Sequence, residues 1–121
     1  MAEIRLDLLN LSLDEIDEVF LSDTPLIATC RADVDDYESA RRSFTLLERA
    51  ILAGANYVDI EIEMPKAVSK DIEHIAHENG TSVIRSYHNL DCTPSFEELK
   101  EVAQRCRLHG GDIVKIAVQG Y

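Results

Sequence analysis

The sequence has few of the residues that build disulfide frameworks, linkers or membrane spans. Only three cysteines, three prolines and five glycines occur among 121 residues, and no apolar run approaches the roughly 20 residues that a membrane-spanning helix needs. Cys30, Cys92 and Cys106 are odd in number, widely spaced and without a C-x-x-C pair, so they indicate neither a disulfide framework nor a zinc site. The charged start of the chain lacks the apolar core of a secretory signal. We therefore expect a cytoplasmic protein with reduced thiols.

Positive charge is also scarce. Twelve lysines and arginines face 23 aspartates and glutamates, which gives a formal net charge of −11. Such a charge repels the phosphates of nucleic acids and anionic membrane surfaces, so we expect neither as a partner. Hydrophobic residues make up 45% of the chain, enough for an ordinary core. A single domain over residues 1–121 is the expected organisation.

Short β-branched runs alternate with longer helical segments along the chain. Ser12 and Glu15 fit a capping box at the start of the first helix, and Gly54 follows a second helix with apolar residues at helical spacing. A third helix is expected near residues 67–80, and a fourth starts at the pair Thr93 and Pro94 and closes at two glycines, 110 and 111. The five expected strands cover residues 2–6, 26–31, 57–63, 82–88 and 112–118.

Strands joined by helices form parallel sheets through right-handed crossovers, either as an open doubly wound sheet or as part of a (β/α) barrel. The central strands of a doubly wound sheet are apolar on both faces, because helices cover both. Here charged and apolar residues alternate: Asp59 and Glu61 fall opposite Val58 and Ile60. Charged groups that converge from several strands toward one interior are how a (β/α) barrel builds an active site, so we favour the barrel.

Lys115 lies within the apolar segment 112–118. Burial and neighbouring cations lower the pKa of a lysine amine and leave a neutral nucleophile that can form an imine with a ketone. The alternative is a strand-end lysine that reaches water or pairs with a glutamate.

His88 ends the expected strand 82–88, and Glu61 lies within the expected strand 57–63 before it. An imidazole titrates near neutral pH and can act as general base and then general acid, and a carboxylate that accepts its hydrogen bond fixes its tautomer. The alternatives are a structural histidine and a carboxylate in an internal ion pair. Because the histidine, the carboxylate and Lys115 fall on three successive expected strands, we expect all three to face inward.

No metal site is expected. His74 and His77 lie three residues apart on one expected helix, but two histidines without further ligands seldom hold zinc. Asp33, Asp35 and Asp36 lack the glycine and the terminal glutamate of a calcium loop. We expect a solvated helix face for the histidines and helix capping for the aspartates.

Five segments in order, AEIRLD, PLIATCR, NYVDIEI, SVIRSYHN with TPSFEEL, and DIVKIAV, resemble successive strands of type I 3-dehydroquinate dehydratases. The resemblance covers essentially the whole chain and implies a (β/α)8 TIM barrel of which about five units are present. It implies that Lys115 forms an imine with the C3 ketone of 3-dehydroquinate, that His88 removes the C2 proton and then protonates the departing C1 hydroxyl, and that Glu61 orients His88. The product is 3-dehydroshikimate, and no metal or external cofactor is implied.

The same resemblance places substrate contacts at Glu3, Arg5 and Arg31. An acidic protein that binds an anionic carboxylate must collect local positive charge, which the two arginines and Lys115 could supply. Their alternative role is ion pairing with neighbouring carboxylates. Residues 32–36 depart from the glutamate and paired glycines common in the family, and Asn89 replaces an aspartate.

Length is the main departure, because a complete (β/α) barrel takes about 250 residues. The chain lacks the family's strand before AEIRLD and everything after the lysine strand. An open sheet with a charged inward face is unstable in water, so we expect a homo-oligomer or completion by further chain. Three explanations are open: the chain is a truncated piece of a longer protein, it is completed by another polypeptide or by self-association, or it is a natural remnant whose sheet flattens and dimerises. The rival functions are a catalytically silent α/β assembly or binding module and another imine-forming barrel such as a class I aldolase.

Overall fold

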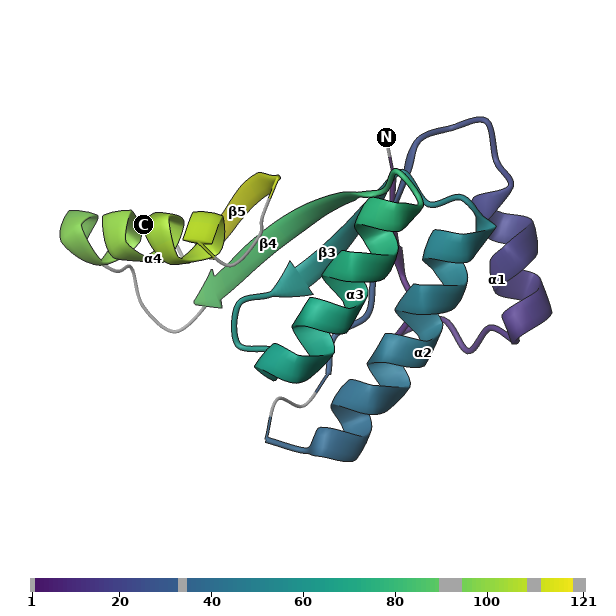
Figure 1. The fold of residues 1–121 in the computed structure, drawn as a ribbon, viewed down its shortest axis with the longest axis horizontal. Helices are drawn as coiled ribbons and strands as arrows, with labels where there is room; N and C mark the ends of the chain where they lie inside the picture. The colour runs from purple at the N-terminus through teal and green to yellow at the C-terminus, as the bar shows by residue number, and fades with distance from the viewer. Residues whose placement is uncertain (1, 33–34, 90–94, 109–111, 119–121) are drawn as a thin grey trace.

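The computed structural model describes residues 2–32, 35–89, 95–108 and 112–118, without the side chains of residues 88–89, 106–108 and 116–118. Strands and helices alternate throughout this part of the chain (Figure 1). The strands are β1 (Ala2–Arg5), β2 (Leu26–Thr29), β3 (Tyr57–Glu61), β4 (Ser82–Asn89) and β5 (Ile113–Val118). The helices are α1 (Leu13–Phe20), α2 (Tyr37–Ala53), α3 (Lys66–Glu78) and α4 (Phe96–Leu108).

The sheet is parallel, and its spatial order is the chain order, β1-β2-β3-β4-β5. A doubly wound sheet reverses direction at a switch point, which places helices on both faces. Without a reversal, right-handed crossovers place every connecting helix on the same face. The sequential order therefore confirms the expected barrel-type arrangement, of which the described strands form an incomplete part.

One face of the sheet packs against the helices. α2 and α3 lie side by side and α1 lies next to α2, while α4 contacts β4 and β5 (Figure 1). The main core combines strand residues such as Ala28, Val58 and Ile60 with Leu47 of α2 and Ile72 of α3, all fully or almost fully buried. A smaller cluster joins α4 to the sheet, formed by Ile62, Tyr87, Val102 and Val114.

The expected helix boundaries are largely confirmed. Ser12 Oγ accepts a hydrogen bond from the Glu15 N–H at 3.2 Å, and Glu15 Oε1 accepts one from the Ser12 N–H at 2.9 Å, which completes the capping box. Gly54 ends α2 with φ of 116°, a left-handed conformation that favours glycine. Asp36 caps α2 by accepting from the Glu38 N–H, which confirms the capping role for this aspartate.

Helix α4 begins at Phe96, and the Ser95 hydroxyl accepts a hydrogen bond from the Glu98 N–H at 3.2 Å. The expected start at Thr93 and Pro94 lies outside the described residues, as do the two glycines expected to close the helix. Cys30 is a buried free thiol, and this burial raises its pKa. Cys92 and the side chain of Cys106 lie outside the described part.

The helices within the described residues are each too short or too polar to cross a membrane.

Candidate active site

The face of the sheet opposite the helices carries most of the site residues expected from the sequence. Strand register aligns Arg5 with Thr29, Thr29 with Asp59, and Glu61 with Ser86 and then Lys115. Aligned residues of parallel strands project to the same side, and residues two apart on one strand share a face. We call this surface the inner face, and it carries Glu3, Arg5, Thr29, Asp59, Glu61, Ser86 and Lys115.

Lys115 lies between two carboxylates of the inner face. Its Nζ is 3.5 Å from Glu3 Oε2 and 3.5 Å from Asp59 Oδ2. The three side chains differ in exposure, with 42% of Lys115, 33% of Glu3 and 1% of Asp59 accessible to solvent. The lysine therefore has the ion-pair partners that one reading of the sequence expected, and a substantial part of its side chain stays accessible to solvent.

Both carboxylates beside Lys115 are also hydrogen-bonded. Glu3 Oε2 accepts from Thr29 Oγ1 at 3.0 Å, and Asp59 Oδ1 accepts from Ser86 Oγ at 2.5 Å. Partial burial raises the pKa of Glu3, but the Thr29 hydroxyl and the Lys115 ammonium outweigh it and hold this pKa below its ordinary value. Glu3 is therefore an anion at neutral pH.

Glu61 is bound by Arg31, which follows β2 along the chain. Arg31 Nη1 donates to Glu61 Oε1 at 2.5 Å, and both side chains are about one-fifth exposed. Arg31 and Glu61, two residues expected in different roles, thus lie in contact. The His88 backbone lies on β4 opposite Ala117, two residues beyond Ser86 on the same strand. The His88 side chain lies outside the described part, so the contact between His88 and Glu61 stays a prediction.

Arg5 is held by Asp7 through two hydrogen bonds. Arg5 Nε lies 3.0 Å from Asp7 Oδ1, and Arg5 Nη2 lies 2.7 Å from Asp7 Oδ2. Burial raises the pKa of Asp7, but the hydrogen bonds from Arg5 and from the backbone of Arg31 outweigh it, so the pKa lies below its ordinary value. Asp7 therefore links the two arginines expected to bind substrate, a role that its sequence position did not reveal.

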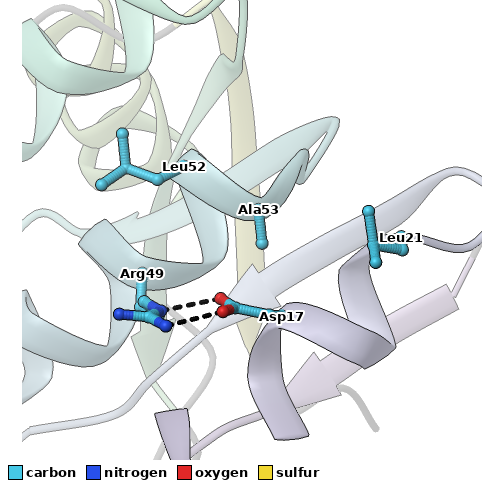
Figure 2. Close-up of a pocket in the computed structure, with 5 residues that line it drawn as sticks. All are labelled: Asp17, Leu21, Arg49, Leu52 and Ala53. Carbon is cyan, nitrogen blue, oxygen red and sulfur yellow. Dashed lines mark hydrogen bonds and ion pairs between the residues drawn. The ribbon is translucent and has the colours of Figure 1, made fainter. Parts of the chain in front are cut away.

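A pocket of about 400 Å³ lies elsewhere, between α1 and α2 (Figure 2). Asp17 and Arg49 meet at its edge in a two-bond ion pair, with distances of 2.7 and 2.6 Å. The remaining lining residues are Leu21, Leu52 and Ala53. α2 ends at Ala53 and leads into the N-terminal end of β3, whereas Glu61 lies at the opposite end of that strand. This pocket shares no residue with the inner face.

His74 and His77 approach different carboxylates. His74 Nε2 is 3.0 Å from Glu78 Oε1, and His77 Nε2 is 3.6 Å from Asp112 Oδ2, with all four side chains about half exposed or more. Within the described residues, no group of three or more histidine, cysteine, aspartate or glutamate side chains is arranged to hold a metal ion.

The chain forms part of a (β/α) barrel with a site on its inner face. This class follows from the sequential parallel sheet, with helices on one face and a lysine among charged residues on the other. The model of the type I 3-dehydroquinase family matches residues 1–120, so the chain belongs to this family. The expected family and fold class are thereby confirmed.

Curated relatives agree with this assignment. The chain is 34% identical to 3-dehydroquinate dehydratase of Bacillus licheniformis over 131 residues, which cover 98% of the chain and 51% of the relative. It is also 34% identical to 3-dehydroquinate dehydratase of Methanocaldococcus jannaschii, over 97% of the chain and 54% of the relative. The chain thus spans about half the length of these curated relatives.

Solved structures show the same relationship. The type I 3-dehydroquinate dehydratase of Clostridium difficile with covalently modified comenic acid superposes with a TM-score of 0.83 at 29% identity. That match covers 96% of the chain and 51% of the other protein. The 3-dehydroquinate dehydratase of Enterococcus faecalis gives a TM-score of 0.78 at 27% identity, over 96% of the chain and 53% of the other protein.

Proposed function

We propose that this chain supplies the imine-forming part of a 3-dehydroquinate dehydratase, a hydro-lyase of the shikimate pathway. The observation that carries the proposal is Lys115 on the inner face of a family barrel, within 3.5 Å of two carboxylates. Family membership supports the substrate, and the partial exposure of the Lys115 side chain is compatible with attack on a ketone.

The proposed reaction is a syn elimination of water. Lys115 condenses with the C3 ketone, and the ketone oxygen leaves as water, which gives a protonated imine. The electron pair of the C2–H bond then delocalises into the iminium as His88 takes the proton. His88 returns that proton to the C1 hydroxyl, which departs as water, and hydrolysis of the imine frees 3-dehydroshikimate and the lysine. These steps require neither a metal nor an external cofactor.

Glu3, Arg5 and Arg31 are the proposed substrate-binding residues. Arg5 and Arg31 sit where β1 and β2 end, which is the end of a barrel that carries the active site. Their contacts with Asp7 and Glu61 fix the guanidinium groups in place before substrate arrives. A guanidinium has five N–H donors, so a carboxylate partner leaves donors for the carboxylate of 3-dehydroquinate. Glu61 has the further proposed role of orienting His88.

The proposed active form contains more strands than the described sheet. β1 and β5 are the edges of that sheet, and a barrel has no edges. We propose residues 1–121 as one partial-barrel domain, completed by further chain, by a second polypeptide or by another copy of itself. The proposed location is the cytoplasm, which suits the free thiol of Cys30.

The test is trapping with sodium borohydride. The protein is incubated with 3-dehydroquinate, reduced, digested and analysed by mass spectrometry. We expect a reduced adduct on Lys115 in the longest reading frame that contains the chain, and none in the Lys115→Ala variant. Lys70, exposed on α3, serves as the internal control lysine and stays unmodified. Absence of the Lys115 adduct in that full-length protein contradicts the proposal.

The half-length match favours one second candidate, a catalytically silent module that binds or assembles. Solution mass and turnover, measured together on the 121-residue chain, separate the two. A monomer without turnover supports the silent module for the isolated chain, and an assembly that forms 3-dehydroshikimate supports the enzyme.

A further inference from the structure

Asp59 is the most buried charged residue of the inner face. Its side chain is 1% exposed, and it lies at the centre of β3. Ser86 Oγ donates to Asp59 Oδ1, while Asp59 Oδ2 faces Lys115 Nζ at 3.5 Å. Among the described residues, this second oxygen has no hydrogen-bond partner. The family resemblance in the sequence gave this aspartate no role.

The carboxylate of Asp59 needs a compensating charge. An ionised carboxylate removed from water is costly unless it is paired with a cation or hydrogen-bonded at both oxygens. Ser86 satisfies one oxygen, and Lys115 is the cation that faces the other. Asp59 and Lys115 are therefore electrostatically linked, and loss of either leaves the other poorly compensated.

Glu3 provides a comparison within the same site. Its Oε2 lies at the same 3.5 Å from Lys115 Nζ, but one-third of its side chain is exposed. Water and salt screen a charge at such a position, whereas a charge inside the protein acts at a lower effective dielectric. Of the two carboxylates, Asp59 thus exerts the stronger field on the lysine nitrogen.

We propose that Asp59, fixed by Ser86, is a positioning residue that holds the nitrogen of Lys115 in place and stabilises its positive charge before and after condensation with a ketone. The inference rests on the proposed imine function and extends it. In the balanced step, the ammonium and the ketone give an iminium and one water molecule: the C–N bond forms, the C–O bond breaks, and two N–H protons leave with the oxygen. The nitrogen is a cation at both ends of this step, so one fixed anion serves both states.

Ser86 has a distinct part in this arrangement. It is fully buried and aligns with Lys115 in the strand register. By donating to Oδ1, its hydroxyl fixes the plane of the carboxylate so that Oδ2 faces the lysine. Removal of the Ser86 hydroxyl keeps the charge of Asp59 but lets its carboxylate rotate. We therefore expect a smaller effect on Lys115 than loss of the Asp59 charge gives.

The experiment uses the full-length protein with the variants Asp59→Asn and Ser86→Ala. Asp17→Asn is the matched control, because it makes the same chemical change on the helical side of the sheet. The first measurement is the rate of the borohydride-trapped adduct at saturating 3-dehydroquinate. The second needs no substrate: trace acetic anhydride labels lysines, and mass spectrometry gives the ratio of Lys115 to Lys70 acetylation at fixed pH.

Asp59→Asn removes the anion that faces Lys115 Nζ at 3.5 Å. A lysine released from this contact is freer to react with the small anhydride, so we expect the acetylation ratio of Lys115 to rise by about tenfold or more. Trapping should slow by at least about tenfold, because the nitrogen is no longer held in place for the ketone and the iminium has lost its fixed anion. Ser86→Ala should shift both in the same direction by about threefold, and Asp17→Asn should change neither. A residue with only a structural role would leave the acetylation ratio unchanged.

The two measurements separate this inference from the proposed function. If the wild-type protein traps no substrate, the proposed function fails, and the acetylation ratio still decides whether Asp59 holds Lys115. If Asp59→Asn folds and leaves the acetylation ratio unchanged, the inference is overturned whether or not substrate is trapped. Circular dichroism checks the fold of each variant. If Asp59→Asn fails to fold, the ratio of Lys115 to Lys70 acetylation in Ser86→Ala decides. A ratio equal to that of the wild-type protein overturns the inference.

Discussion

Lys115 and Glu3 lie 3.5 Å apart at Nζ and Oε2, although they belong to the two edge strands of the described sheet. Neighbouring strands are about 4.8 Å apart, so four steps across a flat sheet separate the edge strands by about 19 Å. A glutamate and a lysine side chain cannot bridge that distance. The sheet is therefore curved with its inner face on the concave side, as barrel closure requires, and the flattened remnant considered from the sequence is not the observed form.

Chemical cross-linking tests this curvature in solution. A carbodiimide joins a carboxylate directly to an amine in contact with it, so we expect an amide between Glu3 and Lys115, identified by mass spectrometry after digestion. Mixing ¹⁴N- and ¹⁵N-labelled protein distinguishes a link within one chain from a link between two copies. The Lys115→Arg variant removes the amine and should lose the link. A Lys115 that links only to carboxylates close in sequence would indicate a flat sheet.

Packing on the helical side of the sheet predicts that two leucines of α2 contribute very differently to the free energy of unfolding. Leu47 is fully buried in the main core, whereas Leu52 of the same helix is 60% exposed. We expect Leu47→Ala to lower the free energy of unfolding by about 2–5 kcal/mol, because it removes buried methyl groups and leaves a cavity. Leu52→Ala should change it by less than about 0.5 kcal/mol. Urea unfolding followed by circular dichroism measures both, and equal effects would contradict the described orientation of α2.

The contact of Asp7 with Arg5 predicts a dependence of stability on pH. The pKa of Asp7 is lowered in the folded state, so its contribution is present above the ordinary value of 3.8 and is lost as the pH falls through the folded value. We expect Asp7→Asn to lower the free energy of unfolding by about 1 kcal/mol at pH 7, since Arg5 is partly exposed, and by progressively less as the pH falls below 3.8 toward 2.

Asp71→Asn is the control for this measurement. Asp71 pairs with Arg41 at 3.6 Å, and both side chains are about half exposed. An exposed ion pair of this kind contributes little to stability. The free energy of unfolding of the variant should therefore differ from that of the wild type by less than about 0.5 kcal/mol at either pH. An Asp7→Asn effect that is as large at pH 2 as at pH 7 would mean that packing, and not charge, gives Asp7 its contribution to stability.

Local signals in the sequence predicted the elements well. Ser12 caps the start of α1 and Gly54 ends α2, as expected, because cap chemistry acts within a few neighbouring residues. The first three strands end one or two residues earlier than expected. Hydrogen bonding partly continues past those ends, since Leu6 N–H donates to the Thr29 carbonyl and Ile62 N–H donates to the Ser86 carbonyl. A run of β-branched residues therefore indicates a strand better than it indicates where the strand ends.

The partners within the site were harder to foresee. Alternation along each strand correctly placed Glu61 and Lys115 on one face. Which residues meet across that face depends on register and curvature, which one strand's sequence does not determine. The ion pair between Asp59 and Lys115 and the contact between Arg31 and Glu61 both join residues about 30 or more positions apart. Ser86, a small polar residue within the expected strand 82–88, was the available signal for a buried polar partner.

The contact between Arg31 and Glu61 leads to the last prediction, which separates substrate binding from catalysis in the full-length protein. Arg31→Lys keeps a positive charge but loses the planar set of donors, so we expect KM to rise at least about tenfold while kcat stays within about threefold. Glu61→Gln keeps an acceptor for Arg31 but removes the negative charge proposed to orient the His88 imidazole. Its kcat should fall about tenfold or more with a smaller change in KM, because a misoriented general base loses part of its roughly 10²–10⁴-fold contribution. Steady-state formation of 3-dehydroshikimate, followed by its absorbance, measures both constants. If Glu61→Gln raises KM alone, as Arg31→Lys does, then Glu61 serves only to hold Arg31, and His88 takes its orientation from another residue.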